Sequence, residues 1–266
     1  MSNNYLPTDY QAFIHTSRYA RWLEKENRRE TWPETVCRYM DNVVKPIVIM
    51  KSEFKKIEDM ILNLSVMPSM RAMMTAGPAL DRDHTAGYNC SYLPVDDPKA
   101  FDEAMYILLC GTGVGFSVER QYIQDLPEVP ELSDSDTTIV VKDSKEGWAK
   151  GLRQVLALLW AGEIPKWDVS QIRPSGARLK TFGGRASGPA PLIDLFNFAV
   201  NTFKTAAGRR LSSLECHDLM CYIGQIVVVG GVRRSAMISL SNLSDGRMRH
   251  AKSGNWWETA GHRALA

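Results

Sequence analysis

Short strand-like runs alternate with longer helical runs over residues 88–240, and this alternation limits the possible folds more than any other feature of the chain. It is typical of α/β proteins whose strands run parallel. Only a few of these strands are convincing. A parallel sheet that small would leave strand edges unpaired, because parallel strands are normally covered on both faces and continued at their sides. The sequence therefore predicts part of a larger α/β structure.

The individual elements are predicted from hydrophobic period and from end signals. Asp97 and Pro98 suit the start of a helix. The predicted strands cover 88–93, 114–118 and 236–240, and the predicted helices cover 101–110, 146–160, 192–204 and 213–229. Residues 124–138, rich in Pro, Asp and Ser, predict a surface loop. Residues 1–65 predict an amino-terminal helical region, with helices from about Thr8 to Lys45 and from Phe54 to Leu64.

Composition excludes several classes of protein. With 44% hydrophobic and 23% charged residues, the chain is an ordinary globular protein, and its formal charge of +2 is too small to indicate direct nucleic-acid binding. The first ten residues lack the apolar segment of a secretory signal, and the longest apolar runs, 155–161 and 226–229, are too short to cross a bilayer. We expect a cytoplasmic protein with no membrane partner.

The five cysteines are an odd number, scattered and without a Cys-x-x-Cys pair: Cys37, Cys90, Cys110, Cys216 and Cys221. That pattern fits neither a disulfide framework nor a metal site, so most should be buried thiols. Cys90 lies on a short predicted strand, where a buried inert thiol is one reading. Cys216 and His217 are adjacent on a predicted helix and point in different directions, so we do not expect them to pair.

The run Gly111-Thr112-Gly113-Val114-Gly115-Phe116 has the glycine content of a nucleotide-binding loop. The dinucleotide fingerprint, however, requires a strand before the glycines and a helix after them. Here a helix comes first and a strand follows. The run therefore predicts a tight packing turn rather than a nicotinamide site.

A basic segment follows Asp168, since no acidic residue occurs again before Asp194. Its cations are Arg173, Arg178, Lys180 and Arg185, set among the glycines of residues 173–178 and 183–189. Glycines let backbone amides approach an anion, arginines bind phosphate through two parallel hydrogen bonds, and a following helix start also favours anions. We interpret the segment as phosphate-binding, with a structural loop that carries basic residues by chance as the alternative.

A second loop, Gly230-Gly231-Val232-Arg233-Arg234-Ser235-Ala236, lies between a predicted helix and a predicted strand. Its two glycines allow movement, and its two arginines can contact a phosphate or a base. The alternative is a glycine helix cap followed by surface arginines.

Together and in this order, these segments resemble the catalytic subunit of ribonucleotide reductases. Residues 183–189 with the preceding 173–176 resemble in particular the monomeric adenosylcobalamin-dependent ribonucleoside-triphosphate reductases, and the similarity runs from residues 19–22 and 28–32 to the end of the chain. The resemblance implies a ten-stranded α/β barrel made of two five-stranded parallel halves around a finger loop. Residues 66–266 would form the first half of that barrel.

The resemblance also implies roles for individual residues. Cys90 matches one of two thiols that reduce the 2′-carbon of the substrate ribose and become a disulfide, which an external thioredoxin-like dithiol then reduces. The residues implied near the ribonucleoside triphosphate are Ser69, Arg71, Asn89, Arg233 and Arg234. Those implied near a deoxynucleoside triphosphate effector are Asp97, Arg178, Gly183, Gly184, Arg185, Ser187, Gly230 and Gly231.

Several parts of the family pattern have no counterpart in this chain. They are the radical cysteine of the finger loop with its neighbouring asparagine and glutamate, the second redox cysteine and a carboxy-terminal cysteine pair. Most adenosylcobalamin contacts would also lie elsewhere. We therefore expect a complementary carboxy-terminal half as partner, and both a split gene and a truncated fragment fit, with the split gene preferred. The alternative function is a nucleotide-binding allosteric module without catalysis, which would not depend on Cys90.

Overall fold

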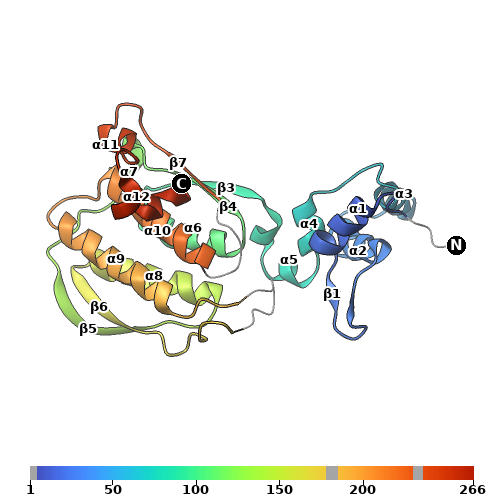
Figure 1. Ribbon diagram of the computed structural model, residues 1–266, viewed down its shortest axis with the longest axis horizontal. Helices are drawn as coiled ribbons and strands as arrows, with labels where there is room; N and C mark the ends of the chain where they lie inside the picture. The colour runs from blue at the N-terminus through green and yellow to red at the C-terminus, as the bar shows by residue number, and fades with distance from the viewer. Residues whose placement is uncertain (1–4, 178–184, 230–235) are drawn as a thin grey trace. The chain divides into compact units, whose positions relative to one another are not determined.

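The computed structural model of the chain describes residues 5–177, 185–229 and 236–266 (Figure 1). It divides into two compact units, Met1–Asn89 and Cys90–Ala266. Residues 66–89, grouped with the later residues in the sequence analysis, lie in the first unit. Across the described residues, no helix combines the length and the apolar character needed to cross a membrane.

The first unit is mostly helical, and within the helical stretch predicted from about Thr8 to Lys45 a second helix begins beside Pro33, as the sequence predicts. A two-stranded antiparallel hairpin, with Trp22 opposite Arg29, interrupts the helices. Asn27 takes a φ of +52°, a turn conformation that asparagine tolerates better than most residues. The elements are α1 (Asp9–Ile14), the π-helix η1 (His15–Tyr19), β1 (Trp22–Leu23), β2 (Arg28–Arg29), α2 (Trp32–Tyr39), the π-helix η2 (Met40–Val44), α3 (Lys51–Leu62), α4 (Met70–Thr75), α5 (Pro78–Arg82) and the 3-10 helix η3 (His84–Gly87).

A small core and one buried ion pair hold this unit together. The core residues are Trp32, Val36, Met40, Val44, Ile61 and Met73. Arg38 Nε donates to Glu30 Oε1 at 2.7 Å, and the same guanidinium donates to the backbone oxygens of Met73 and Ala76. Arg38 thereby ties α2 to α4, which explains why residues after 65 pack with this unit.

The second unit alternates strands with helices as the sequence predicts. Its elements are β3 (Cys90–Pro94), α6 (Lys99–Leu109), β4 (Gly113–Ser117), α7 (Arg120–Ile123), β5 (Ser133–Val140), α8 (Lys145–Trp160), β6 (Glu163–Asp168), α9 (Ala190–Ala206), α10 (Ser213–Val229), β7 (Met237–Leu240), α11 (Gly246–Arg249), α12 (Trp256–Thr259) and the 3-10 helix η4 (Gly261–Leu265). Strands β3, β4 and β7 form one parallel sheet in that order, and β5 pairs with β6 in a second parallel sheet. The α/β class is confirmed, whereas the ten-stranded barrel stays a prediction.

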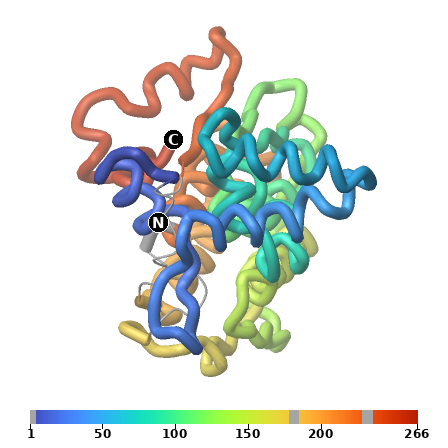
Figure 2. The backbone as a smooth tube through the Cα atoms, turned by 90° about the vertical axis from the view of Figure 1, so that its right-hand side faces the viewer, coloured from blue at the N-terminus to red at the C-terminus, as the bar shows by residue number. Residues whose placement is uncertain are grey.

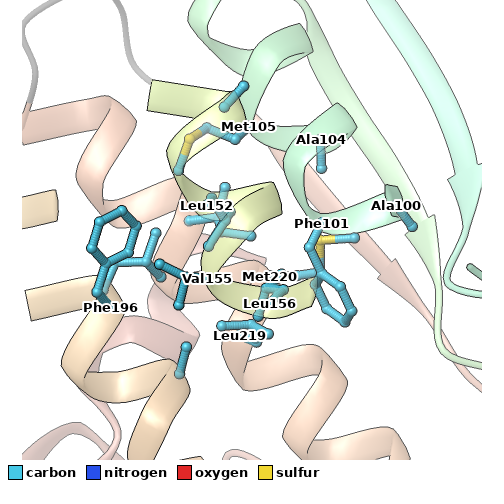
Figure 3. Packing of buried hydrophobic residues seen from close by; sticks show 14 of the residues in the cluster. Ala100, Phe101, Ala104, Met105, Leu152, Val155, Leu156, Phe196, Leu219 and Met220 are labelled. Carbon is cyan, nitrogen blue, oxygen red and sulfur yellow. The ribbon is translucent and has the colours of Figure 1, made fainter. Parts of the chain in front are cut away.

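The core of the second unit lies between its helices and the three-stranded sheet. Figure 3 shows side chains of α6, α8, α9 and α10 meeting there, among them Phe101, Leu152, Phe196 and Leu219. Leu93, Val114 and Phe116 of the sheet belong to the same cluster. The chain after β7, red in Figure 2, turns back toward α10, where the Arg263 guanidinium contacts the Asp218 carboxylate at 2.6 Å.

Two strands differ from the sequence predictions. β6 was not predicted, and β5 starts at Ser133, inside the segment predicted as a loop. Most β5 side chains are exposed and polar, so the strand lacks the apolar alternation by which strands are predicted. Its pairing with β6, from Ser133 opposite Glu163 to Val140 opposite Asp168, supplies the hydrogen bonds that such a strand requires.

Candidate functional site

Cys90 opens β3 and lies opposite Gly113 of β4. Side chains alternate along a strand, so Cys90 shares a face of the sheet with Tyr92, while Leu93 points into the core. On β7 the same alternation leaves Ile238 and Leu240 exposed. We call the face that carries Cys90, Tyr92, Ile238 and Leu240 the open face. Because Cys90 is exposed, it is not the buried thiol of the alternative reading.

The other cysteines of the second unit are buried: Cys110, Cys216 and Cys221. Burial raises the pKa of the Cys221 thiol to about 12, and it also raises that of Cys216 well above its ordinary value. Thiols held in their neutral form react slowly, because the thiolate is the nucleophile. Cys37 is exposed but belongs to the first unit. Cys90 is therefore the one accessible thiol of Cys90–Ala266.

His217 of α10 lies behind the three-stranded sheet. Its Nδ1 is 3.0 Å from Ser239 Oγ, and its Nε2 is 3.5 Å from Cys221 Sγ. Burial lowers the imidazole pKa to about 4, so the ring is neutral near pH 7. A neutral imidazole beside a high-pKa thiol is not a thiolate–imidazolium pair. The expected lack of pairing between Cys216 and His217 agrees with this arrangement, whereas the helical i, i+4 partner Cys221 was missed.

The glycine run after α6 forms the predicted packing turn. Gly111 has a φ of +83°, which glycine adopts without strain. A Cβ atom added at Gly115 would lie 3.3 Å from Ile238 Cγ2, so the central strand approaches its neighbour closely there. The order is helix, turn, strand, and the interpretation as a packing turn is confirmed.

The described parts of the basic segment are paired with each other. Arg185 Nη1 donates to Gly176 O at 2.9 Å, while Ala186 and residues 176–177 exchange two backbone hydrogen bonds. Arg173 is neutralised by Asp143, at 2.7 Å. Ser187 is half-buried beside them. The remaining predicted residues of this segment, Arg178, Gly183 and Gly184, lie outside the described residues.

Asp97 lies at the start of α6. Its Oδ1 accepts a hydrogen bond from Lys99 N at 2.8 Å, and its backbone oxygen accepts from Ala100 N. The contact at the helix start that the sequence predicts is therefore present, and it satisfies an amide that the helix leaves free. Its proposed contact with an effector stays a prediction.

The predicted substrate residues that are described lie in the first unit. Ser69 precedes α4, and its Oγ accepts weakly from Ala72 N at 3.5 Å. Arg71 is buried, and its Nε is 3.4 Å from Asn89 Oδ1. The structure thus brings Arg71 and Asn89 together. Arg233 and Arg234, with the glycines Gly230 and Gly231 before them, lie outside the described residues.

Sequence reasoning missed a group of polar side chains on β3, β4 and the start of α7. The Tyr92 hydroxyl forms hydrogen bonds with Tyr122 and Ser117, and Ser117 Oγ donates to Glu119 Oε2 at 2.9 Å. Burial of the hydroxyl is the main cause that raises the pKa of Tyr92. The period-2 spacing of Cys90 and Tyr92 is the sequence signal that could have pointed to Tyr92.

A cavity of about 1090 Å³ lies where α10 begins. Within its lining Arg209 forms two hydrogen bonds with Glu215, and Asp245 accepts from Ser213 Oγ. Over the described ranges 5–177, 185–229 and 236–266, no cluster of His, Cys, Asp and Glu side chains could hold a metal ion.

Comparisons with known proteins agree on one family. Residues 118–203 match the family model described as the insertion domain of B12-dependent ribonucleotide reductase. Adenosylcobalamin-dependent ribonucleoside-triphosphate reductases from Levilactobacillus brevis and Lactobacillus leichmannii are 27% and 28% identical to this chain, each over 85% of its length. The chain spans 40% of the length of these relatives.

A solved structure has the same fold. The crystal structure of a B12-dependent (class II) ribonucleotide reductase superposes with a TM-score of 0.80 at 23% sequence identity. The match covers 96% of this chain and 44% of that one. The arrangement of parallel strands and helices described above is therefore the arrangement found in part of that protein.

Proposed function

We propose that this chain, which is similar to the B12-dependent ribonucleotide reductases, forms part of an enzyme that reduces ribonucleoside triphosphates to 2′-deoxyribonucleotides. The observation that carries the proposal is Cys90: an accessible thiol at the start of a parallel strand, in a chain whose relatives are named for this reaction. The other thiols of its unit are buried.

Cys90 would supply one of the two thiols that the reduction consumes. The 2′-hydroxyl leaves as water, hydrogen takes its place on the carbon, and two thiols are oxidised to one disulfide. A thioredoxin-like dithiol then reduces that disulfide by exchange. Because the other three cysteines of Cys90–Ala266 are buried, the partner thiol has to come from outside this unit.

The substrate and effector residues follow from the family pattern. We assign Ser69, Arg71 and Asn89 to the ribonucleoside triphosphate, together with Arg233 and Arg234. The contact between the buried Arg71 and Asn89 supports this, because it places two of the assigned residues side by side. The effector residues are assigned to the start of α6 and to the two glycine loops: Asp97, Arg178, Gly183, Gly184, Arg185, Ser187, Gly230 and Gly231.

Adenosylcobalamin is the proposed cofactor, since the relatives are named for it. When bound, it would supply the initiating radical through its carbon–cobalt bond. The described residues do not fit it by themselves: the cavity at the start of α10 is lined mostly by charged and polar residues, whereas a corrin ring requires a broad apolar contact. We therefore assign most cofactor contacts to a complementary segment, on this or another polypeptide, that also carries the radical cysteine.

The test is Cys90→Ser in the assembled enzyme. We expect turnover with a dithiol reductant to fall to background, because serine cannot form the disulfide. Cys37→Ser is the matched control, since Cys37 is also exposed but lies in the first unit, and it should leave turnover within about twofold. Normal turnover of the Cys90→Ser enzyme would contradict the proposal.

The allosteric module remains the second candidate, favoured by the paired ends of the basic segment. It predicts that deoxynucleoside triphosphates bind equally well to the chain and to its Cys90→Ser variant. It also predicts that no reduction occurs even when the complementary segment is present.

A further inference from the structure

Resting on the proposed function, we propose that Tyr92 is a positioning residue: its ring forms the wall that holds the substrate ribose against the Cys90 thiol. Tyr92 has no assigned role in the sequence analysis. Its place on the open face, its fixed hydroxyl and the glycines beside it carry the assignment.

The register of the sheet places Tyr92 next to Cys90. The two residues are two apart on β3 and so share the open face. Same-face neighbours on a strand are roughly 7 Å apart. The opposite face of the sheet is filled by Leu93, Val114 and Phe116 of the core. A group that contacts the Cys90 thiol must therefore approach over the open face, within reach of the Tyr92 ring.

The Tyr92 side chain crosses from β3 onto β4. Its hydroxyl is hydrogen-bonded to Ser117, which lies two residues beyond Gly115, the cross-strand partner of Tyr92. Because side chains alternate along β4, Ser117 lies on the open face. It is nevertheless fully buried, so neighbouring side chains cover it. A second hydrogen bond, with Tyr122 after β4, fixes the same hydroxyl. The ring is thus held at both ends, although about half of the residue is exposed.

Glycines leave the middle of the open face without side chains beside Cys90 and Tyr92. Gly113 lies opposite Cys90, and Gly115 lies opposite Tyr92. A Cβ atom at Gly115 would be 3.8 Å from Tyr92 Cδ2 and 3.3 Å from Ile238 Cγ2. At Gly113 and Gly115 the central strand therefore forms a floor without side chains, with Cys90 and Tyr92 on one side and Ile238 on the other.

This shape explains why the wall is aromatic. A ribose lying on the glycine floor would meet Cys90 at one end and the Tyr92 ring beside it. The ring and the exposed Ile238 are apolar and displace water from the reacting carbon, while the fixed hydroxyl prevents the ring from rotating away. Misplacement of a reactant by about 1 Å costs on the order of 100-fold in rate.

The test compares Tyr92→Ala and Tyr92→Phe in the assembled enzyme. Loss of the ring should lower kcat by about 100-fold and raise KM by no more than about tenfold, because the ring sets geometry rather than overall affinity. Phenylalanine keeps the ring and loses only its anchor, so it should restore kcat to within about tenfold of wild type. A merely structural residue would not give this split between kcat and KM.

Tyr222→Phe is the matched control, since Tyr222 stacks on Phe198 at a centroid distance of 4.5 Å, within the helical layer. It should leave both constants unchanged. If Tyr92→Ala does not fold, Gly115→Val supplies the second test, because it fills the floor and should lower kcat in a folded enzyme. Wild-type kcat in Tyr92→Ala, or in Gly115→Val where that variant is used, would overturn the inference. If Tyr92→Ala keeps wild-type kcat but Cys90→Ser is inactive in the same assay, only the role of Tyr92 is refuted and the proposed function stands. An active Cys90→Ser enzyme would refute the proposed function itself.

Discussion

Burial sets the chemistry of individual side chains in Cys90–Ala266. Cys221 and His217 are 3.5 Å apart, a distance at which an exposed pair could exchange a proton. Burial instead raises the pKa of the thiol and lowers that of the imidazole, so both groups stay neutral near pH 7. Cys90, by contrast, is exposed, because it lies at the first position of a strand, on the open face.

His217 should make the stability of the chain depend on pH. The pKa of the buried imidazole is about 4 in the folded state and 6.5 when the ring is exposed. Between these two pH values the unfolded state therefore binds a proton that the folded state does not bind. Stability is therefore lost as pH falls from 6.5 toward 4. Between pH 7 and pH 5 the loss from this residue should be about 2 kcal/mol.

Chemical denaturation of wild type and His217→Gln at both pH values measures this loss. Glutamine cannot titrate, so the variant should lose about 2 kcal/mol less between the two pH values than wild type does. Identical pH dependence in the two proteins would contradict a depressed imidazole pKa.

The residue-scale features differ in how well the sequence predicts them. The contact of Asp97 at a helix start follows from local end signals, and it was predicted. To predict the pairing of His217 with Cys221, one would need both the helical i, i+4 spacing and the identity of the buried helix face. The network of Tyr92, Ser117 and Tyr122 joins three elements, and no local pattern encodes it.

At the scale of elements, helices with an apolar face were predicted well. The α8 helix runs from Lys145 to Trp160 after the cap Ser144, within a residue of its predicted start. β6 was missed, and β5 was predicted only at its end, where Val140 and Val141 indicate a strand edge, because the two strands are stabilised by pairing with each other and not by an apolar pattern in either strand. The β1–β2 hairpin was missed because the aromatic and basic residues around it also fit helical spacing.

Gly147 gives a test of how tightly the first turn of α8 packs. Alanine usually stabilises a helix relative to glycine, by up to about 1 kcal/mol. A Cβ atom at Gly147 would, however, lie 2.3 Å from the backbone oxygen of Lys142. Gly147→Ala should therefore destabilise the protein by about 1–3 kcal/mol, because backbone has to move.

The control is Gly246→Ala at the first position of α11, where a Cβ atom meets nothing within 4 Å. It should be neutral or slightly stabilising. Equal midpoints of thermal unfolding for the two alanine variants would show that α8 can shift away from Lys142 without cost.

At the scale of the whole molecule, the parallel α/β class and the similarity to B12-dependent ribonucleotide reductases agree with what the sequence predicts. The resemblance was inferred from motifs spread along the chain, and relatives at 27–28% identity match over 85% of its length. The three-stranded sheet leaves β3 and β7 as edge strands among the described residues, and it exposes Tyr92, Ile238 and Leu240. Edges and apolar side chains of this kind require cover. We expect that cover from a segment equivalent to the 60% of the relatives that this chain does not match. Local sequence patterns in this chain do not encode the contacts that such a segment would make.

The residues Cys90–Ala266 contain too few accessible thiols to reduce a ribose. Reduction of a ribose consumes two thiols, but three of the four cysteines in Cys90–Ala266 are buried, so Cys90 has no accessible partner within its unit. The 266-residue chain alone, given adenosylcobalamin, a ribonucleoside triphosphate and a dithiol, should therefore form no deoxynucleotide. Chromatography of the nucleotides after a long incubation measures this. Addition of a polypeptide that carries the remaining portion of the relatives should start turnover, because it brings the second thiol to the open face. Sustained product from the Cys37→Ser form of the chain alone, in which Cys90 is the one exposed thiol, would mean that no second accessible thiol is required, and the role assigned to Cys90 would then be wrong.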